Sequence, residues 1–401
     1  LRQGDETLEA ARWSARAAYW AGHSRPRDAL RLWRTVMELV DALPEEERGE
    51  ETDTLAIASR LCQLQYAWRV GMDPAEQERL LREAEEIADK HSDLHSLVLL
   101  RMSTSARPGV QHHTSDWLAA IEETIRLAEE SGDLNLQVAI RAASSYAYLC
   151  AGDFAGYERA LDEMIELSGG DPSVGAGIIL HSPLAWAEMG KGMVRREAGD
   201  LDAAGEYFER ALRMALDGDD SETASWIRSN QVGLLAMRGE AEAALALARR
   251  NCELTERIGD IFSRSLARAH LAWAQIAVEE FEQGLESIEE ADQIYREAMK
   301  VGGEMEGWRS QIRTKALIGL GRVEEAIEEA EWAVGVSRER GLGWSLPLAL
   351  LAQAQALNAG GRDGAAEALD EAERVARETG ALVCLDEIEA EREAVGSGAE
   401  R

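Results

Sequence analysis

Gly321-Arg-Val-Glu-Glu-Ala-Ile-Glu-Glu-Ala330 is one copy of a turn signal that recurs through this chain. Other copies begin at Gly152, Gly199, Gly239 and Gly361, and a copy without glycine begins at Glu279. The successive intervals are 47, 40, 40, 42 and 40 residues. Each turn is flanked by runs rich in alanine and leucine, so this period predicts a stacked array of helix pairs.

The composition fits an all-helical chain. Of the 401 residues, 45% are hydrophobic and 5% aromatic, and only 7 are prolines. The segments between the turns have helical rather than alternating periodicity. We therefore predict an all-α fold, a right-handed superhelical solenoid of antiparallel helix pairs with repeats of about 40 residues. Residues 1–401 are expected to form a single solenoid of about nine pairs.

Three segments depart from the regular pattern. Irregular loops are expected over residues 107–115, which contain Pro108, and over 168–183, which are rich in glycine. Long loops in tight arrays tend to lie on one rim and to carry function. A last helix over about 381–394 has no partner and is expected to cap the exposed core.

The net charge of −32, from 75 acidic and 43 basic residues, excludes several partners. Phosphate backbones and anionic lipids would be repelled, so neither nucleic acid nor a membrane is expected to bind. The sequence has neither a long apolar run nor the pattern of a signal peptide. Its four cysteines are widely spaced, which suits reduced thiols and a cytoplasmic location.

The turn and the small residues that follow it at helical spacing, clearest from Gly321 to Ala330, resemble a tetratricopeptide repeat. Such repeats have about 34 residues, whereas the repeats here are longer. They are similar to the long repeats in the carboxy-terminal halves of large bacterial signalling ATPases, including MalT-like regulators.

A second resemblance covers nearly the whole chain. Its carriers are Ala10-Ala-Arg-Trp13, Asp28-Ala-Leu-Arg-Leu-Trp-Arg34, Leu43-Pro-Glu-Glu-Glu47 and the loop from Gly169-Gly-Asp-Pro172 to His181-Ser-Pro183. These stretches resemble the region that follows the cyclase and ATPase modules of bacterial class III adenylate/guanylate cyclases. The resemblance implies a catalytic module upstream of Leu1. The chain, which starts without methionine, is accordingly expected to be part of a longer protein.

No catalytic, metal or cofactor site is expected. The stretch Met189-Gly-Lys191 lacks the glycine and the hydroxyl residue of a phosphate-binding loop, because Ala185 and Gly192 stand at those positions. His112, His113 and Asp116 are too few, and wrongly spaced, for a typical metal site. The many adjacent glutamates are typical of a solvated helix face.

Three tryptophans share one place in the repeat. Trp186, Trp226 and Trp308 each stand thirteen residues before a turn glycine, so a solenoid aligns them in a stripe. On the inner face, this stripe would bind a peptide or a flat ligand. The alternative is that the rings wedge between neighbouring pairs. We add Trp273 and His181 to the candidate binding residues.

The leading hypothesis is a non-catalytic regulatory scaffold, the sensor or interaction region of a bacterial multidomain cyclase or ATPase. Its partners would be a protein, a peptide or a small-molecule effector, together with the upstream module. The first alternative is a self-standing adaptor that binds a peptide in its concave groove. The second is the effector-sensing arm of a MalT-like transcription regulator.

Overall fold

Helices dominate the computed structural model, which describes residues 3–22, 25–91, 93–111, 113–299 and 305–398. These residues contain nineteen α-helices, two short 3₁₀ helices and no strand. The first helices are α1 (Gln3–Ala21), α2 (Pro26–Asp41), η1 (Glu45–Glu47), α3 (Glu50–Val70), α4 (Pro74–His91), α5 (Leu94–Gln111), α6 (Thr114–Ser131), α7 (Leu134–Ala151), α8 (Phe154–Ser168), α9 (Pro183–Glu197) and α10 (Leu201–Asp217). The chain continues through α11 (Ser221–Met237), α12 (Ala241–Ile258), α13 (Ile261–Ala277), α14 (Phe281–Met299), α15 (Glu306–Gly319), α16 (Val323–Arg340), α17 (Leu346–Ala359), α18 (Ala365–Thr379), η2 (Leu382–Cys384) and α19 (Leu385–Gly398).

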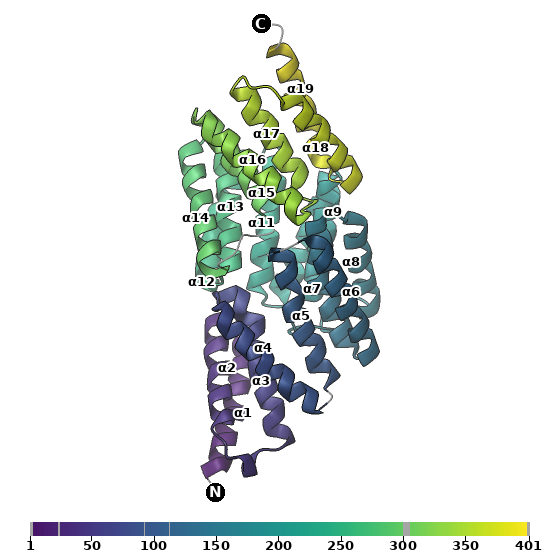
Figure 1. Ribbon diagram of the computed structural model, residues 1–401, viewed down its shortest axis with the longest axis vertical. Coiled ribbons are helices and arrows are strands. Elements are labelled where there is room, and N and C mark those ends of the chain that lie inside the picture. The colour runs from purple at the N-terminus through teal and green to yellow at the C-terminus, as the bar shows by residue number, and fades with distance from the viewer. Residues whose placement is uncertain (1–2, 23–24, 92, 112, 300–304, 399–401) are drawn as a thin grey trace.

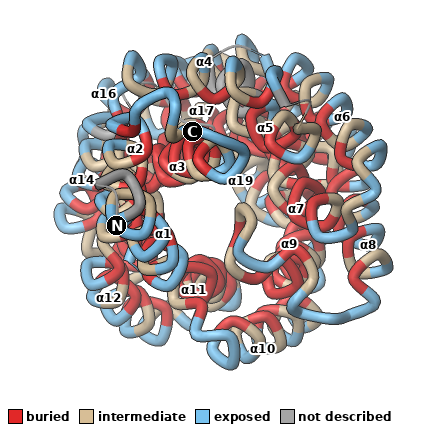
Figure 2. The backbone as a smooth tube through the Cα atoms, turned by 90° about the horizontal axis from the view of Figure 1, so that it is seen from below, coloured by how far each residue is buried: buried red, intermediate tan, exposed pale blue. Residues whose placement is uncertain are grey.

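The helices wind into an elongated superhelix with the two termini at opposite ends (Figure 1). Viewed along the long axis, the backbone forms a ring (Figure 2). The odd-numbered helices α1, α3, α9 and α11 lie on the inner side of this ring, and the even-numbered α4, α6, α8, α10 and α12 lie on its outer side. The predicted all-α solenoid is confirmed.

The turn signal ends the first helix of each pair through one backbone conformation. The turn glycines take left-handed φ angles of 76° (Gly152), 86° (Gly199), 75° (Gly239), 72° (Gly321) and 59° (Gly361). The copy without glycine does the same, because Glu279 has a φ of 62°. An L-residue is strained in this region, so the repeat geometry imposes the conformation even where the sequence lacks the residue that suits it.

One predicted loop is wrong. The backbone of α5 stays helical to Gln111, and α6 already begins at Thr114, so most of residues 107–115 are not a loop. Arg107-Pro108-Gly109 lies near the end of α5, although a proline beyond the first helical turn removes a backbone hydrogen bond and crowds the carbonyl group four residues earlier. The second expected loop does separate α8 from α9. At the C-terminal end, η2 precedes α19, which packs on α17 and α18.

Successive turns of the superhelix touch through glycine. Gly343, between α16 and α17, lies against the end of α7, where an added Cβ would stand 2.2 Å from the carbonyl oxygen of Ala151. Thr114 Oγ1 donates a 2.8 Å hydrogen bond to the carbonyl oxygen of Gly341 in the same loop. Residues far apart in sequence are therefore packed along the long axis.

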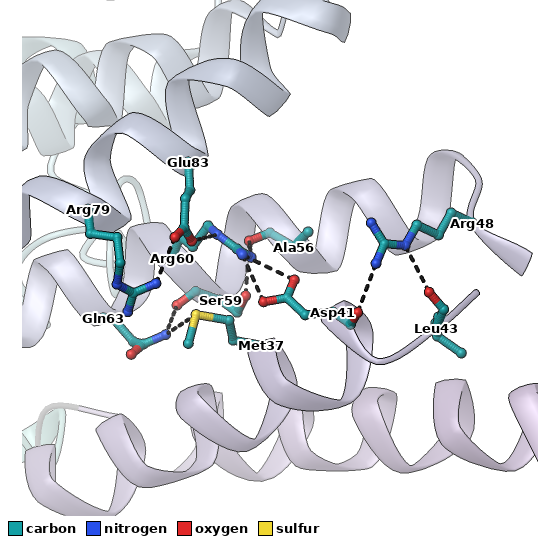
Figure 3. A network of polar contacts seen from close by, with 10 residues as sticks. All are labelled: Met37, Asp41, Leu43, Arg48, Ala56, Ser59, Arg60, Gln63, Arg79 and Glu83. Atoms are coloured by element: carbon teal, nitrogen blue, oxygen red, sulfur yellow. Dashed lines mark hydrogen bonds and ion pairs between the residues drawn. The ribbon is translucent and has the colours of Figure 1, made fainter. Parts of the chain in front are cut away.

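The apolar core has two large parts that meet on α7. Leu136 and Ile140 belong to the part formed with α1–α5, whereas Val138 and Ala142 belong to the part that continues to α19. A polar network supports the N-terminal part (Figure 3). There the buried Arg60 of α3 donates to Asp41 of α2 at 2.9 Å and to Glu83 of α4 at 2.8 Å. The arginine thus joins three consecutive helices.

The strained turn at Glu279 gives a direct test. The substitution Glu279→Gly should raise the free energy of unfolding by about 1 kcal/mol, because glycine accepts a positive φ without steric cost. Urea unfolding followed by circular dichroism measures this change. The matched control is Gly239→Ala, whose added Cβ meets no atom within 4 Å and whose φ is 75°. The free energy of unfolding of Gly239→Ala should fall by a similar amount. A Glu279→Gly variant that is less stable than the wild type would contradict the strain inferred at Glu279.

Candidate functional site: a cavity inside the superhelix

A cavity of about 670 Å³ lies on the inner side of the superhelix. Its walls come mainly from the odd-numbered helices α7, α9, α11, α13, α15 and α17, and η2 with the first turn of α19 closes one side. The first helix of each pair therefore faces inward. Aromatic rings form much of the wall, namely Tyr146, Trp186, Trp226, Phe262, His270, Trp273, Trp308 and Trp344.

One group of rings, the first aromatic cluster, consists of Tyr146, Trp186, Trp226, Phe262 and Trp68. The centroid of Trp186 lies 6.2 Å from that of Tyr146 and 5.8 Å from that of Trp226. Phe262 lies 5.9 Å from Trp226. Trp68 of α3 approaches both of these rings, at 6.3 and 5.6 Å. Each such ring pair stabilises the fold by about 0.5–1.5 kcal/mol in addition to the burial of its apolar surface. Because the rings hold one another in place, this wall is already formed without a ligand.

The second aromatic cluster is centred on Trp308. Its centroid lies 4.7 Å from His270, 6.0 Å from Trp273 and 6.4 Å from Trp344. The approach of Trp273 to α11 depends on a small residue, because a Cβ at Gly233 would lie 2.7 Å from its ring. The cavity therefore has an aromatic wall at each of two places along its length.

Hydrogen bonds fix the indole rings of successive repeats. Trp186 Nε1 donates to Ser145 Oγ at 2.9 Å, and Trp226 Nε1 donates to Ser263 Oγ at 2.8 Å. Trp226 is only 3% exposed and Trp308 only 4%, yet both line the cavity. The two interpretations of the stripe thus describe the same rings, which pack between repeats and also form the inner wall.

A charged pair stands at the end of α9. Arg196 donates through Nε and Nη2 to Glu197 Oε1, at 3.0 and 2.7 Å, and through Nη1 to Asn230 Oδ1 at 2.9 Å. Glu197 is 3% exposed and lines the cavity. Its other carboxylate oxygen, Oε2, accepts no hydrogen bond within the described chain. This oxygen is also not one of the unpaired polar atoms that are completely buried. We conclude that this oxygen is open to the cavity.

Two neutral side chains add hydrogen-bonding capacity. Gln311 is 8% exposed and lines the cavity, and its amide forms no hydrogen bond within the described residues. The ring of His270 is 6% exposed and its Nδ1 bonds the carbonyl oxygen of Leu266 at 2.9 Å. Burial lowers the pKa of His270 to about 3. The ring is therefore neutral near pH 7, with Nδ1 as donor and Nε2 as acceptor.

The C-terminal cap adds a second charged pair. Lys315 of α15 forms an ion pair with Glu387 of α19, and Gln355 donates to the same carboxylate at 3.0 Å. Burial alone would raise the pKa of Glu387, but Lys315 and Gln355 hold it below its usual value. With Asp386, the charged side chains lining the cavity are two cations and three carboxylates. The site is thus slightly acidic.

Four of the five predicted binding residues lie together. Trp186, Trp226, Trp273 and Trp308 all line the cavity. His181 does not: its Nε2 lies 3.0 Å from the carbonyl oxygen of Gly218, in the loop between α10 and α11. The surrounding loop 168–183 also contributes no lining residue. It packs instead on both parts of the apolar core, with Ile178 and Ile179 against the N-terminal part and Val174 and Leu180 in the other. Gly175 N also donates to Asn135 Oδ1 of α7 at 3.0 Å.

Sequence reasoning missed Glu197, Gln311 and Trp344. Trp344 lies outside the shared register, in the turn before α17, so the repeat spacing gave no signal for it. Glu197 and Gln311 resemble ordinary polar positions in a helical sequence. Only the helix register relative to the turn glycines, applied to polar residues as well as tryptophans, would have indicated their inward direction.

Metal binding and membrane insertion were both argued against from sequence. Among the described residues, no group of three or more His, Cys, Asp and Glu side chains is arranged to hold a metal ion. His112 lies outside the described residues, whereas His113 caps α6 by accepting a hydrogen bond from Ser115 N at 3.2 Å. None of the helices within the described ranges is both long and apolar enough to cross a bilayer.

Comparison with known proteins shows the fold but no family. No protein-family model matches the chain, and no curated protein matches it in sequence. Among solved structures, a Rap protein complexed with Competence and Sporulation Factor has a TM-score of 0.66 at 10% identity, covering 93% of this chain and 99% of that one. Aspartyl phosphate phosphatase F from Bacillus subtilis has a TM-score of 0.51 at 14% identity, covering 93% of each chain. The chain is thus similar in fold to these helical repeat proteins.

His270 should make the protein sensitive to acid. The unfolded chain takes up a proton on this residue below a pKa of 6.5, whereas the folded chain resists protonation down to about pH 3. Stability is therefore lost as pH falls through this window, by ~2 kcal/mol between pH 6.5 and 5. Urea unfolding at pH 7 and pH 5 should show a smaller loss in His270→Gln than in the wild type. Equal losses of stability in the variant and the wild type would contradict the conclusion that His270 is buried in its neutral form.

Proposed function

We propose that this chain is a regulatory scaffold that binds a short peptide in the cavity of its superhelix. The observation that carries the proposal is the aromatic cavity itself, where two clusters of rings enclose unpaired hydrogen-bonding groups. Its volume of about 670 Å³ lies within the range typical of ligand sites. Peptide recognition commonly combines apolar pockets for side chains with polar groups that bond the main chain.

The polar groups favour a particular ligand chemistry. Glu197 Oε2 and His270 Nε2 are acceptors, whereas the Gln311 amide both donates and accepts. Arg196 and Lys315 already pair with carboxylates. The cavity therefore offers more acceptors than free cations, which favours a neutral or cationic peptide over an anionic one.

The fold supports a binding role. The Rap protein with the similar superhelix was solved with Competence and Sporulation Factor bound to it. At 10% identity this likeness carries no residue-level assignment, so the argument depends on the cavity of this chain. Among the hypotheses from the sequence, the first alternative, an adaptor that binds a peptide in its inner groove, agrees best with this cavity.

Wider contexts stay predictions. The loop from Gly169 to Pro183 resembles the corresponding stretch of class III cyclases, where an upstream catalytic module would read the state of this scaffold. A MalT-like transcription regulator would use the same cavity to sense a small effector. Sequencing the gene on the 5′ side of the codon for Leu1 would distinguish these contexts, and peptide binding in the cavity is compatible with each of them.

The substitution Trp226→Ala tests the site. A library of short synthetic peptides, screened by thermal shift, should yield neutral and cationic ligands that stabilise the wild-type chain. Calorimetric titration with the best peptide should show a loss of about 1–3 kcal/mol in Trp226→Ala, since buried tryptophans are frequent anchors. Glu197→Gln should reduce the preference for cationic over anionic peptides of matched sequence.

A matched control separates binding from stability. Trp332 on α16 is 48% exposed and is absent from the cavity wall, so Trp332→Ala should bind with unchanged affinity. If Trp226 only supports the core, Trp226→Ala will melt earlier and yet bind with unchanged affinity per folded molecule. That result, or a library without any ligand that depends on cavity residues, would overturn the proposal.

A further inference from the structure

Helix α1 has two apolar faces, and the described residues cover only one of them. Ala11, Ala15 and Ala18 are buried against the neighbouring helices. On another side, Trp13 and Trp20 are 61% and 79% exposed. Trp13, Ala17 and Trp20 are separated by four and then three residues, which is the spacing of side chains that pack between helices. We call Trp13, Ala17 and Trp20 the open seam.

Unpaired arginines flank the open seam. The Arg16 guanidinium lies 5.0 Å from the centroid of Trp13, and that of Arg25 lies 4.4 Å from the centroid of Trp20. Neither arginine makes an ion pair with a described residue. Other arginines of the first two helices are paired, namely Arg12 with Glu51, Arg31 with Asp28 and Arg34 with Glu76, so Arg16 and Arg25 are the cations beside these rings, in a chain of net charge −32. The seam is thus a basic, aromatic surface on an acidic molecule.

The opposite end of the molecule presents a complementary surface. On α19, Ile388 is buried, whereas Glu389, Ala390 and Glu393 are exposed at helical spacing. The two glutamates flank a small side chain, and Glu389 also forms an exposed ion pair with Arg392 of the same helix at 3.1 Å. These residues do not line the cavity. Because α1 and α19 lie at opposite ends of the superhelix, neither surface can reach the other within one molecule (Figure 1).

We propose that the open seam of one molecule docks on α19 of a second copy, so that the protein associates head to tail. Trp13 and Trp20 would pack beside Ala390, and Arg16 and Arg25 would pair with Glu389 and Glu393. Tryptophan and arginine are the residue types that most often dominate an interface. Pairing α1 with a second α1 would instead place arginines opposite each other. The contact joins different surfaces, so it extends the array rather than closing it.

Sedimentation velocity over a concentration series tests the contact. The wild-type chain should form species larger than a monomer as concentration rises, and added salt should weaken this association. The double substitution Trp13→Ala, Trp20→Ala should keep the chain monomeric, with an unchanged melting temperature because both side chains are exposed. A wild-type chain that stays monomeric throughout the series would overturn the proposal.

A charge exchange identifies the partner surface. Arg16→Glu with Arg25→Glu should leave two acidic ends, and Glu389→Arg with Glu393→Arg should leave two basic ends, so each variant alone should be monomeric. An equimolar mixture restores opposite charges across the contact and should associate again. Association of either variant by itself, or a mixture that stays monomeric, would place α1 against another surface or another protein and exclude the head-to-tail contact.

Discussion

Arg69 and Glu222 stand 153 positions apart and form an ion pair that is almost completely enclosed. Arg69 also donates to the carbonyl oxygen of Ile179 at 3.3 Å and lies 4.1 Å above the ring of Trp68. Burial raises the pKa of Glu222 to about 7, although Arg69 opposes this shift. Such a pair adds little net stability, but leaving one charge without its partner costs about 3–5 kcal/mol. The N-terminal helices are thereby held in one position against α11.

That position shapes the cavity. Trp68, held beneath Arg69, contacts both Trp226 and Phe262 of the first aromatic cluster. A residue of α3 thus supports a wall formed by α11 and α13, about five repeats later along the chain. A solenoid without contacts between its turns would transmit such effects only from neighbour to neighbour. Here the superhelix closes on itself, and distant repeats share one packed region.

The sequence predicted what depends on neighbouring residues. Turn glycines such as Gly239 specify where helices end, and the tryptophan register specified the inward face on which Trp226 and Trp308 lie. Contacts between superhelical turns were not predictable, because they depend on small rotations summed over many repeats. The approach of Gly343 to Ala151, and the enclosure of Gln311 and Glu197, are of this kind. His181 lies in the glycine-rich loop, which packs on both parts of the apolar core and not on the cavity.

The cavity wall depends both on the local repeat pattern and on contacts between superhelical turns. Trp344 lines the cavity beside Trp308, and its backbone N–H lies 3.5 Å from the carbonyl oxygen of Cys150 at the end of α7. The loop that carries Trp344 therefore joins the cavity to the contact between turns. A ligand packed against Trp344 would favour the curvature in which this contact forms. The size of the shift is limited by the difference in its affinity for the tighter and looser superhelix. A scaffold that worked in this way would need no hinge, because its curvature would be the variable that a bound ligand changes.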